Sequence, residues 1–406
     1  MSDNKIKVLI NNLPKSLRPV ARFLRHQESA SGLSTTRYIQ DVSTCLIPKA
    51  VFSRSIEDLT ENTFLETTEE ALIYLSPAIL GEHVARKCFS RGLNPELKKE
   101  VSETGVNLIK KAEKNLLVRE NNKKILPVKA AIALAATAIP LTEFSLNYIK
   151  NLMTLKLFNK SDFRNIASLE NNREDAKHQE KVKSSAKKHI IGAGITYAGF
   201  WGLAGLLATK GKNSKTLQKI SEFIVAPGNK LFSKNEKAKN FVNKYFNMDF
   251  AKSPKGKLVL SKGQLTTCVL VGGCGYFGAS ADRGKENLKE TATRFPLVAL
   301  YVITGSELVE KGFKNLLYKY GKCTDVMNSK KEVTPFEELG KLAEKLAKEK
   351  GSTVDKEFKS LIKQKGVIFG IPYLFALGVM GFFVSGMTVL STKKRYEKEK
   401  LQHKSV

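Results

Sequence analysis

Two long uncharged segments limit what this 406-residue chain can fold into. Residues 190–209 contain 20 consecutive residues without a charged side chain, and residues 366–392 contain 27. A helix needs about 20 apolar residues to cross the hydrocarbon of a bilayer, because it rises about 1.5 Å per residue. Both segments are long enough to do so. The sequence therefore predicts a mainly α-helical, multi-pass membrane protein that also carries polar amphipathic helices.

Three further apolar segments are shorter or interrupted. Residues 263–281 lack charged side chains but are rich in glycine. Residues 125–141 contain Lys129, and residues 295–306 stop before Glu307. The last two segments fall below the length that an uninterrupted span needs. The chain therefore has three spans by length, or five if the two marginal segments also cross, and both schemes stay open.

The two marginal segments look like copies of one another. Residues 139–153 and 303–317 each contain an isoleucine, a glutamate four residues later and the sequence Lys-Asn-Leu. A carboxylate beside an apolar segment is costly in lipid, so Glu143 and Glu307 should face protein, water or a cation. As a matched pair they are candidates for binding a cation or relaying a proton. The simpler interpretation is that each marks the point where its helix leaves the hydrocarbon.

Glycines extend this match into the longer segments. Residues 194–197 resemble residues 370–373, and two more glycines recur at matching places downstream. Lipid provides no hydrophobic driving force between helices, so small residues that permit close backbone approach hold membrane helices together. We expect such packing at Gly194, Gly202, Gly205, Gly370, Gly378 and Gly381. The pattern predicts an internal duplication of a helical hairpin, and such faces would also allow a homo-oligomer.

The chain divides into five regions by composition. They are a polar, amphipathic helical N-terminal region (1–124), a first membrane hairpin (125–209), a basic connector (210–262), a third apolar segment with a second membrane hairpin (263–392, including a polar helical insert at 318–365) and a basic tail (393–406). The connector carries 13 lysines against three acids, which is typical of a cytoplasmic loop. Connector and tail share one side of the membrane if three segments span, and lie on opposite sides if five do.

The formal net charge of +29 indicates an anionic partner. We favour an anionic membrane surface over nucleic acid, because no aromatic residues are interleaved with the basic ones and no recognition module is visible. One short basic amphipathic helix suits such a surface, with its charges at Lys15, Arg18, Arg22 and Arg25. A surface helix packed on its own domain would show the same pattern. Lysine-rich, arginine-poor composition is also a bias of AT-rich genomes.

Residues that usually form catalytic or metal sites are scattered along the chain. The five cysteines and five histidines show no paired spacing, so we expect no metal and no cofactor. No GxSxG or HExxH motif is present. A single GxGxxG at residues 273–278 is a remote indication of a nucleotide-binding protein. The polar segment that follows this motif is poorly suited to packing on a sheet, which argues against that interpretation.

The sequence therefore favours a non-enzymatic membrane anchor or organiser, with basic helical regions on the membrane surface. The alternative is a small secondary transporter or channel component built on the repeated hairpins. Polarity inside the membrane distinguishes the two, because transporters place several ionisable residues or broken helices at mid-membrane. The two long segments, 190–209 and 366–392, contain no ionisable acid or base.

The membrane prediction can be tested by extraction. We expect the protein to stay in the membrane pellet after washing with alkaline carbonate and to be released by detergent, because apolar segments of this length partition into the bilayer. Release into the carbonate supernatant would contradict an integral membrane fold.

Overall fold

The described residues of the computed structural model are 3–28, 32–76, 119–248, 251–252 and 258–404, and they are almost entirely helical. The first elements are α1 (Asp3–Asn12), α2 (Arg18–Gln27), α3 (Gly32–Val51), α4 (Ile56–Ser76), α7 (Arg119–Ala135), α8 (Ala138–Phe158), α9 (Phe163–Ile166) and α10 (Ala176–Lys210). The middle elements are η4 (Gly211–Asn213), α11 (Lys215–Val225), α12 (Pro227–Leu231), α13 (Glu236–Phe246), the paired antiparallel strands β1 (Ala251–Lys252) and β2 (Leu258–Val259), α14 (Lys262–Asp282) and α15 (Lys285–Leu300). The last elements are η5 (Tyr301–Gly305), α16 (Ser306–Lys319), η6 (Thr324–Val326), η7 (Phe336–Glu338), α17 (Leu339–Lys350), α18 (Val354–Phe375), η8 (Ala376–Phe383) and α19 (Val384–Lys404). The mainly α-helical prediction is confirmed, whereas residues 77–118 of the predicted N-terminal region lie outside the described residues.

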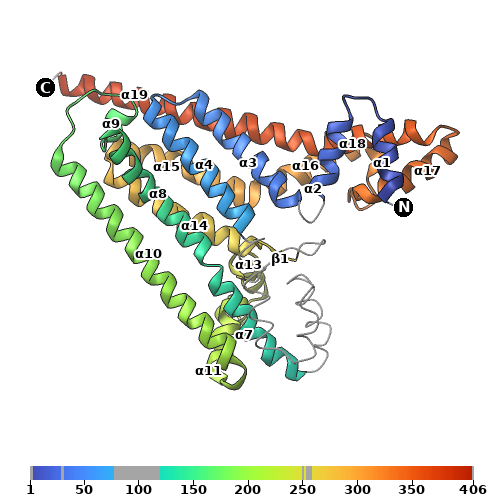
Figure 1. The fold of residues 1–406 in the computed structure, drawn as a ribbon, viewed down its shortest axis with the longest axis horizontal. Helices are drawn as coiled ribbons and strands as arrows, with labels where there is room; N and C mark the ends of the chain where they lie inside the picture. Colours follow the sequence, from blue (N-terminus) through green and yellow to red (C-terminus); the bar gives the residue numbers. More distant parts are fainter. Residues whose placement is uncertain (1–2, 29–31, 77–118, 249–250, 253–257, 405–406) are drawn as a thin grey trace.

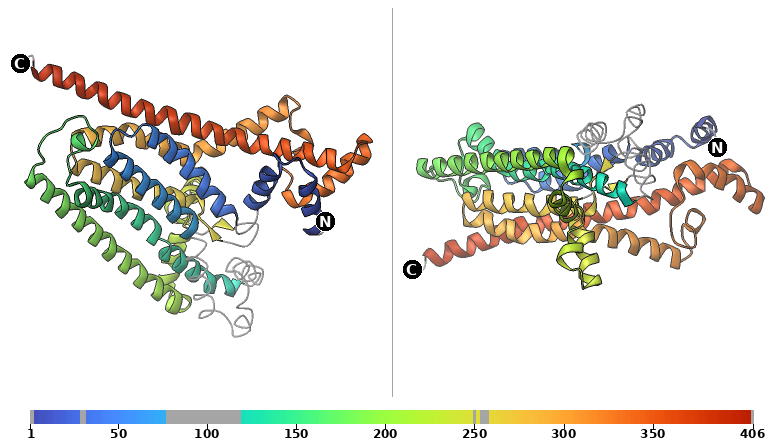
Figure 2. Two further views of the ribbon diagram at one scale, coloured as in Figure 1. Left: turned by 45° about the horizontal axis from the view of Figure 1, so that its top comes forward. Right: turned by 90° about the horizontal axis from the view of Figure 1, so that it is seen from below.

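The long helices lie side by side as a bundle (Figures 1 and 2). α14 packs against α8 and α15, α8 also contacts α4 and α10, α3 packs against α4 and η8, and α15 packs against α19. The short helix α9 marks one end of the bundle, where α4, α10 and α15 begin and α3, α8 and α14 finish. We call this the α9 end. At the opposite end, which we call the α13 end, α10 finishes and α14 begins next to α13.

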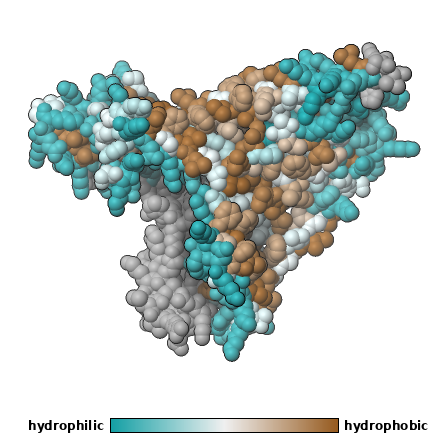
Figure 3. All heavy atoms as spheres, turned by 180° about the vertical axis from the view of Figure 1, so that it is seen from behind, coloured by the Kyte–Doolittle hydropathy of each residue, from teal (hydrophilic) through white to brown (hydrophobic). Residues whose placement is uncertain are grey.

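Three helical segments are long and apolar enough to cross a membrane. They are Leu126–Phe158, Ala176–Asn213 and Val354–Gln402. The predicted helices over 190–209 and 366–392 are thus confirmed as parts of α10 and of the continuous α18–η8–α19 helix. The apolar stretch of Leu126–Phe158 is mostly covered by protein, whereas those of the other two are largely uncovered. Figure 3 shows hydrophobic residues gathered across the middle of one face, between hydrophilic ends.

Exposed apolar side chains follow the two uncovered helices. On α10 they include Ile191, Ile195, Trp201 and Leu206, and on α18–η8–α19 they include Leu374, Val379, Phe383 and Leu390. Water would make such a continuous apolar surface costly, and contiguous patches of this kind mark a protein or membrane contact. The pattern is the one expected of helices that face lipid tails.

The N-terminal helices and the polar insert at 318–365 share one hydrophobic core, which we call the head. Apolar residues of α1 and α2, such as Ile6 and Leu24, pack with Phe336, Leu339 and Phe358 of the insert. The sequence analysis placed these segments in separate regions, because nothing local reveals that residues more than 300 positions apart pack together. The C-terminal part of the head, α18, continues without a break into the apolar part of the Val354–Gln402 helix.

The head also changes the interpretation of the basic amphipathic helix. Its apolar residues Ala21 and Leu24 are buried against the head, so that face does not contact lipid. Among its charges, Arg18 donates a hydrogen bond to the Leu13 carbonyl, and Arg25 pairs with Glu337. Lys15 and Arg22 remain at the exposed surface. The alternative of a surface helix packed on its own domain describes α2 better than a helix lying in a membrane surface.

The predicted helix-packing glycines are at open positions, with one exception. A Cβ atom built at Gly194, Gly202, Gly205, Gly370 or Gly378 would meet no heavy atom within 4 Å. These five glycines therefore do not make the close helix contacts within the chain that we predicted for them. Gly381 is different: a Cβ there would lie 2.5 Å from the Thr44 carbonyl oxygen and 2.6 Å from Pro48 Cγ. Pro48 has no N–H, so it leaves the Thr44 carbonyl without its helical donor, and Gly381 fits over that gap.

Close packing by glycine occurs instead along α14. A Cβ at Gly275 would lie 2.5 Å from the Phe144 carbonyl oxygen of α8, and one at Gly272 would lie 2.6 Å from the Glu143 carboxylate. Gly273 faces the ring of Phe295 in α15 and Gly278 faces the hydroxyl of Tyr148 in α8. α14 is thus the thin central helix that lets α8 and α15 approach from both sides.

Two π-helical segments interrupt long helices in the bundle. η5 begins five residues after Pro296, and η8 begins four residues after Pro372. Proline removes the hydrogen bond to the carbonyl four residues before it, so each π-helical segment follows a helical turn that is already weakened. π-helical turns are rare and concentrate at functional positions. η8 packs directly against α3, so this π-helical geometry lies within the bundle rather than on a free end.

The two proposed repeat units have different surroundings. α8 lies between α10 and α14, and its Glu143 is buried. The matching segment is split between η5 and α16, and its Glu307 is exposed. α8 and α10 are nevertheless neighbours, as are α16 and α18. The internal duplication stays a prediction of the sequence.

Matched glycine-to-alanine variants test the packing along α14. Gly275→Ala should lower the melting temperature in detergent, because its Cβ must displace the backbone of α8 and such overpacking costs about 1–3 kcal/mol. Gly202→Ala has room for its Cβ and gains up to about 1 kcal/mol of helix propensity, so it should melt at the same temperature or higher. A stable Gly275→Ala variant would contradict the central position of α14.

Candidate functional site

The acidic residues of α4 form the most unusual feature of the bundle interior. Glu57, Glu61 and Glu66 are buried, and Glu69 and Glu70 are half-buried. We call these five residues the buried acidic row. A buried carboxylate is strongly destabilising unless it is protonated, paired or hydrogen-bonded. The partners of each acid therefore decide what the row can do.

The tightest contact of the row joins Glu61 to Arg283. Both guanidinium NH₂ groups of Arg283 donate to the Glu61 carboxylate, at 2.7 and 2.6 Å, and the Arg283 side chain is only 1 % exposed. Arg283 follows the last residue of α14, where a cation also interacts favourably with the helix dipole. Thr154 of α8 donates its hydroxyl to the same carboxylate, and Lys150 Nζ lies 4.0 Å from it. One acid of α4 thereby links three helices.

Arg54 makes a second charged link at the α9 end. Its NH₂ groups donate to the Glu290 carboxylate of α15 at 2.8 and 3.0 Å, and its Nε donates to Asp58 at 3.2 Å. The guanidinium also lies 5.1 Å from the ring centre of Phe163 in α9. Nearby, Lys160 Nζ donates to Glu57 at 2.8 Å. The row is therefore well neutralised where it approaches the α9 end.

The middle of the row contacts α3. Lys49 forms an ion pair with Glu66, and the Cys45 thiol and the carboxylates of Glu66 and Glu70 lie within 4.8 Å of one another. Thiol and carboxylate groups at this spacing can hold a metal ion. Here the ammonium of Lys49 already neutralises the Glu66 carboxylate, which disfavours binding of a divalent cation at this position. One helix turn beyond Glu70, the Tyr74 hydroxyl donates to Asp41 of α3.

These contacts extend over most of a bilayer's thickness. Glu57 and Tyr74 are 17 residues apart on one helix, which corresponds to about 25 Å at the rise of an α-helix. The hydrocarbon core of a bilayer is about 30 Å thick. Ionisable side chains thus follow one another through the inside of the bundle, from the α9 end toward the α13 end, while apolar side chains cover the outside.

Glu143 lies beside this row and lacks the cationic partner that Glu57, Glu61 and Glu66 have. It is 92 % buried in α8, where its carboxylate packs against Gly272 of α14. No hydrogen bond reaches its Oε2 atom. Glu69 of the row is its electrostatic neighbour. Lys150 lies two turns further along α8, with its ammonium 5.5 Å from the ring centre of Tyr276.

Glu307, the predicted counterpart of Glu143, has a different environment. Its side chain is half exposed and accepts a hydrogen bond from Lys262 at 2.7 Å. That bond, together with the nearby charges of Lys244 and Lys311, holds the pKa of the Glu307 carboxyl below its ordinary value. Glu143 meets α14 at Gly272 and Glu307 meets it at Lys262, about 15 Å apart along the helix. The two glutamates do not converge, and Glu307 is a surface residue at the α13 end.

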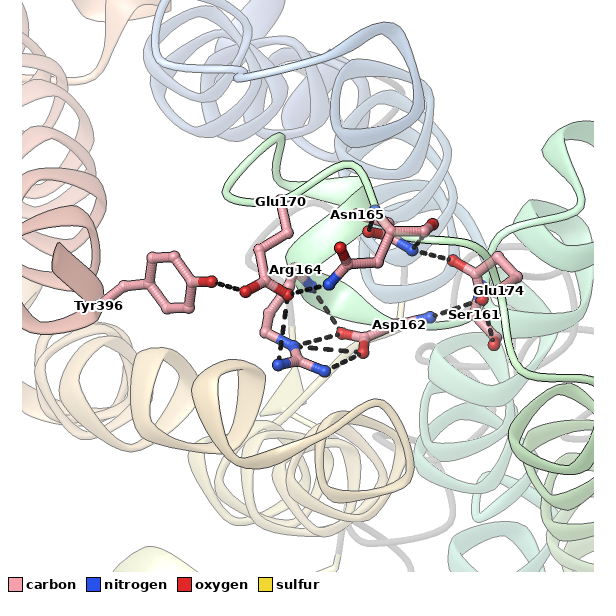
Figure 4. Close-up of polar contacts among 8 residues, drawn as sticks. Ser161, Asp162, Arg164, Asn165, Glu170, Glu174 and Tyr396 are labelled. Atoms are coloured by element: carbon pink, nitrogen blue, oxygen red, sulfur yellow. Dashed lines mark hydrogen bonds and ion pairs between the residues drawn. The ribbon is translucent and has the colours of Figure 1, made fainter. Parts of the chain in front are cut away.

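The α9 end is closed by a polar network, shown in Figure 4. Arg164 pairs with Asp162 at 2.7 Å, and Glu174 accepts hydrogen bonds from Ser161 and Asn165, each at 2.8 Å. Tyr396 of α19 donates its hydroxyl to Glu170, which joins the loop around α9 to the last helix (Figure 4). The network fixes α9, and with it the Phe163 ring that covers Arg54.

The GxGxxG sequence at residues 273–278 lies within α14 and is helical throughout. Its three glycines face Phe295, Phe144 and Tyr148 of neighbouring helices. A dinucleotide site instead needs these glycines in the turn between a strand and a helix, with room for a pyrophosphate. The motif is thus explained by helix packing and not by nucleotide binding.

No protein-family model matches the chain, and neither curated proteins nor solved structures show a significant match to it. The functional evidence therefore lies in the arrangement of the buried acidic row, Glu143 and their partners.

A stability measurement tests whether the buried Glu143 carboxylate lowers the unfolding free energy of the protein. Glu143→Met keeps the length of the side chain and removes an unsatisfied buried carboxylate, so it should raise the unfolding free energy in detergent by about 1–3 kcal/mol. Glu307→Met is the control and should change stability by less than about 1 kcal/mol, because its ion pair is exposed. Destabilisation by Glu143→Met would show that the carboxylate has a structural role.

Proposed function

We propose that this chain is an integral membrane protein that conducts or transports protons through its helical bundle, as a small secondary transporter or channel component. The observation that carries the proposal is the position of Glu143. It is a buried carboxylate with an unsatisfied oxygen, placed beside the acidic row of α4 and against the glycine-lined face of α14. Intramembrane acids of this kind are costly and usually belong to ion pathways or proton relays.

The arrangement of ionisable residues supports a transporter over an anchor. The apolar segments 190–209 and 366–392 lack ionisable acids and bases, but α3, α4 and α8 bring such residues between them and α14. The π-helical segment η8 adds a local departure from α-helical hydrogen bonding against α3. Ionisable groups and interrupted helices are both features of membrane transport sites.

In the proposed mechanism Glu143 is the group that alternates between its protonated and charged forms. Toward the α9 end, a proton reaches or leaves it through Glu69. Toward the α13 end, Glu70 and the hydrogen-bonded Tyr74–Asp41 pair continue the path. The cations Arg283 and Lys49 keep Glu61 and Glu66 charged and in place. These two glutamates therefore line the path and do not carry the proton.

The test is proton flux in vesicles that contain the purified full chain. With a potassium diffusion potential as driving force and a pH-sensitive dye inside, we expect acidification faster than in protein-free vesicles. Glu143→Gln should lower this flux at least tenfold, because an amide cannot take up and release a proton. Glu307→Gln is the matched control and should leave the flux unchanged, since Glu307 is a surface residue.

Both variants should elute from size-exclusion chromatography as the wild type does, so that a loss of flux cannot be attributed to misfolding. Flux no greater than in protein-free vesicles, or flux that Glu143→Gln leaves unchanged, would contradict the proposal.

A membrane organiser is the second candidate, and one observation favours it. The head is a separate hydrophobic core built on α18, and α18 continues as one helix into the apolar segment. Such a rigid connection would hold the head at a defined distance from the bilayer. Absence of flux, with the protein still resistant to carbonate extraction, would favour this function.

A further inference from the structure

The basic connector contains a second surface that neither the acidic row nor the head explains. Its helices α11, α12 and α13 lie at the α13 end, after α10 finishes at Lys210 and before α14 begins at Lys262. The apolar part of α10 finishes just before them, so they lie where that helix would leave the hydrocarbon. The connector therefore lies at the level of a membrane boundary if α10 spans.

α13 is attached to the protein by polar groups. It has no buried residue. Asn243 accepts a hydrogen bond from the Gly228 backbone N–H at 2.8 Å and donates one to Asn229 at 3.0 Å. At its end, the Asn247 carbonyl accepts a hydrogen bond from Ser261 at 3.1 Å, beside Gly263. These contacts fix the position of α13 without covering its apolar side chains.

Large apolar side chains are consequently exposed on α13 and its neighbours. Phe241 is 59 % exposed and Phe246 is 40 % exposed. Beside them on α11 and α12 and in the following turn, Phe223, Leu231 and Phe232 are exposed as well. The spacing of Phe241, Val242 and Tyr245 places them on one side of the α13 helix, and Asn240 lies on the opposite side.

Lysines surround this apolar surface. Lys237 and Lys244 border it on one side and Lys239 on the other, and the whole connector carries 13 lysines against three acids. The ammonium groups of Lys244 and Lys262 lie 5.3 and 5.2 Å from the ring centre of Tyr245. Aromatic residues bordered by lysines are typical of helices that lie in the headgroup region of an anionic bilayer.

We propose that the connector surface formed by α13, Phe223 and residues 231–232 binds anionic lipid headgroups and inserts its aromatic side chains into the membrane interface. A second copy of the chain is the poorer occupant, because an isologous contact would place one lysine-rich surface against another. Anionic lipid supplies the complementary charge, and each lysine near such a surface adds to binding. The lipid site and the proposed proton path use different residues, so the lipid site does not depend on the proton path.

The experiment places a tryptophan in α13 of the full chain in lipid vesicles. Trp201 is the single tryptophan, so Trp201→Phe provides a silent background. In vesicles containing phosphatidylglycerol, tryptophan at Phe241→Trp should be quenched by brominated lipid. Its quenching by aqueous iodide should be at least threefold weaker than that of tryptophan at Asn240→Trp. Tryptophan at the matched control Asn240→Trp should be quenched by iodide and not by brominated lipid.

The dependence on lipid charge is measured with the same probe. Protection of Phe241→Trp from iodide should fall at least twofold when phosphatidylcholine replaces phosphatidylglycerol. With Lys237, Lys239 and Lys244 changed together to glutamine, the difference between the two lipids should largely disappear. Equal iodide quenching at both tryptophan positions would overturn the proposal, and so would shielding of Phe241→Trp from both quenchers, which would indicate a protein partner.

Discussion

The bidentate contact between Glu61 and Arg283 is the interaction on which the interior of the bundle depends. It joins residues 222 positions apart, and it places α4, the most acidic of the long helices, against the end of α14. Without the guanidinium, Glu61 would be a buried charge in a medium that cannot solvate it. Because the pair also holds Thr154 and Lys150 of α8 nearby, it sets the positions of three helices at once. The other acids of α4 lie inside the bundle because they are on the same helix as Glu61.

This arrangement reverses the polarity of a water-soluble bundle. Charged residues occupy the inside of the helical layer, and the uncharged faces of α10 and α18–η8–α19 form its outside. The glycines of α14 make that interior narrow, so acids on α4 and α8 approach a thin central helix. Glu143 is a buried acid whose Oε2 atom accepts no hydrogen bond in this geometry. Proteins retain such costly groups where function requires them, which connects the stability of the bundle with the proposed proton path.

The sequence predicted the features that are local and missed those that depend on distant partners. Residues 190–209 and 366–392 are recognisable as long apolar helices because their lack of charge is visible within a single window. Glu143 was singled out for its cost in lipid, and the structure buries it. The acids of α4 were missed because a helix with six acids resembles an exposed surface helix until Arg283 and Lys150 are placed beside it. Of the predicted packing glycines only Gly381 packs closely within the chain, and other close glycine contacts lie along α14. A glycine allows close packing only where another element lies opposite, and no sequence pattern reveals that element.

A double-mutant cycle on Glu61 and Arg283 tests the central claim most directly. Unfolding free energies of the full chain in lipid-like detergent would be measured for Glu61→Gln, Arg283→Met, the double variant and the wild type. Each single change should cost about 3–5 kcal/mol because it leaves a buried partner unpaired, and the double variant should recover at least about 2 kcal/mol of the summed loss. Single losses below about 1 kcal/mol that simply add would place the two residues in solvent and contradict a charged interior.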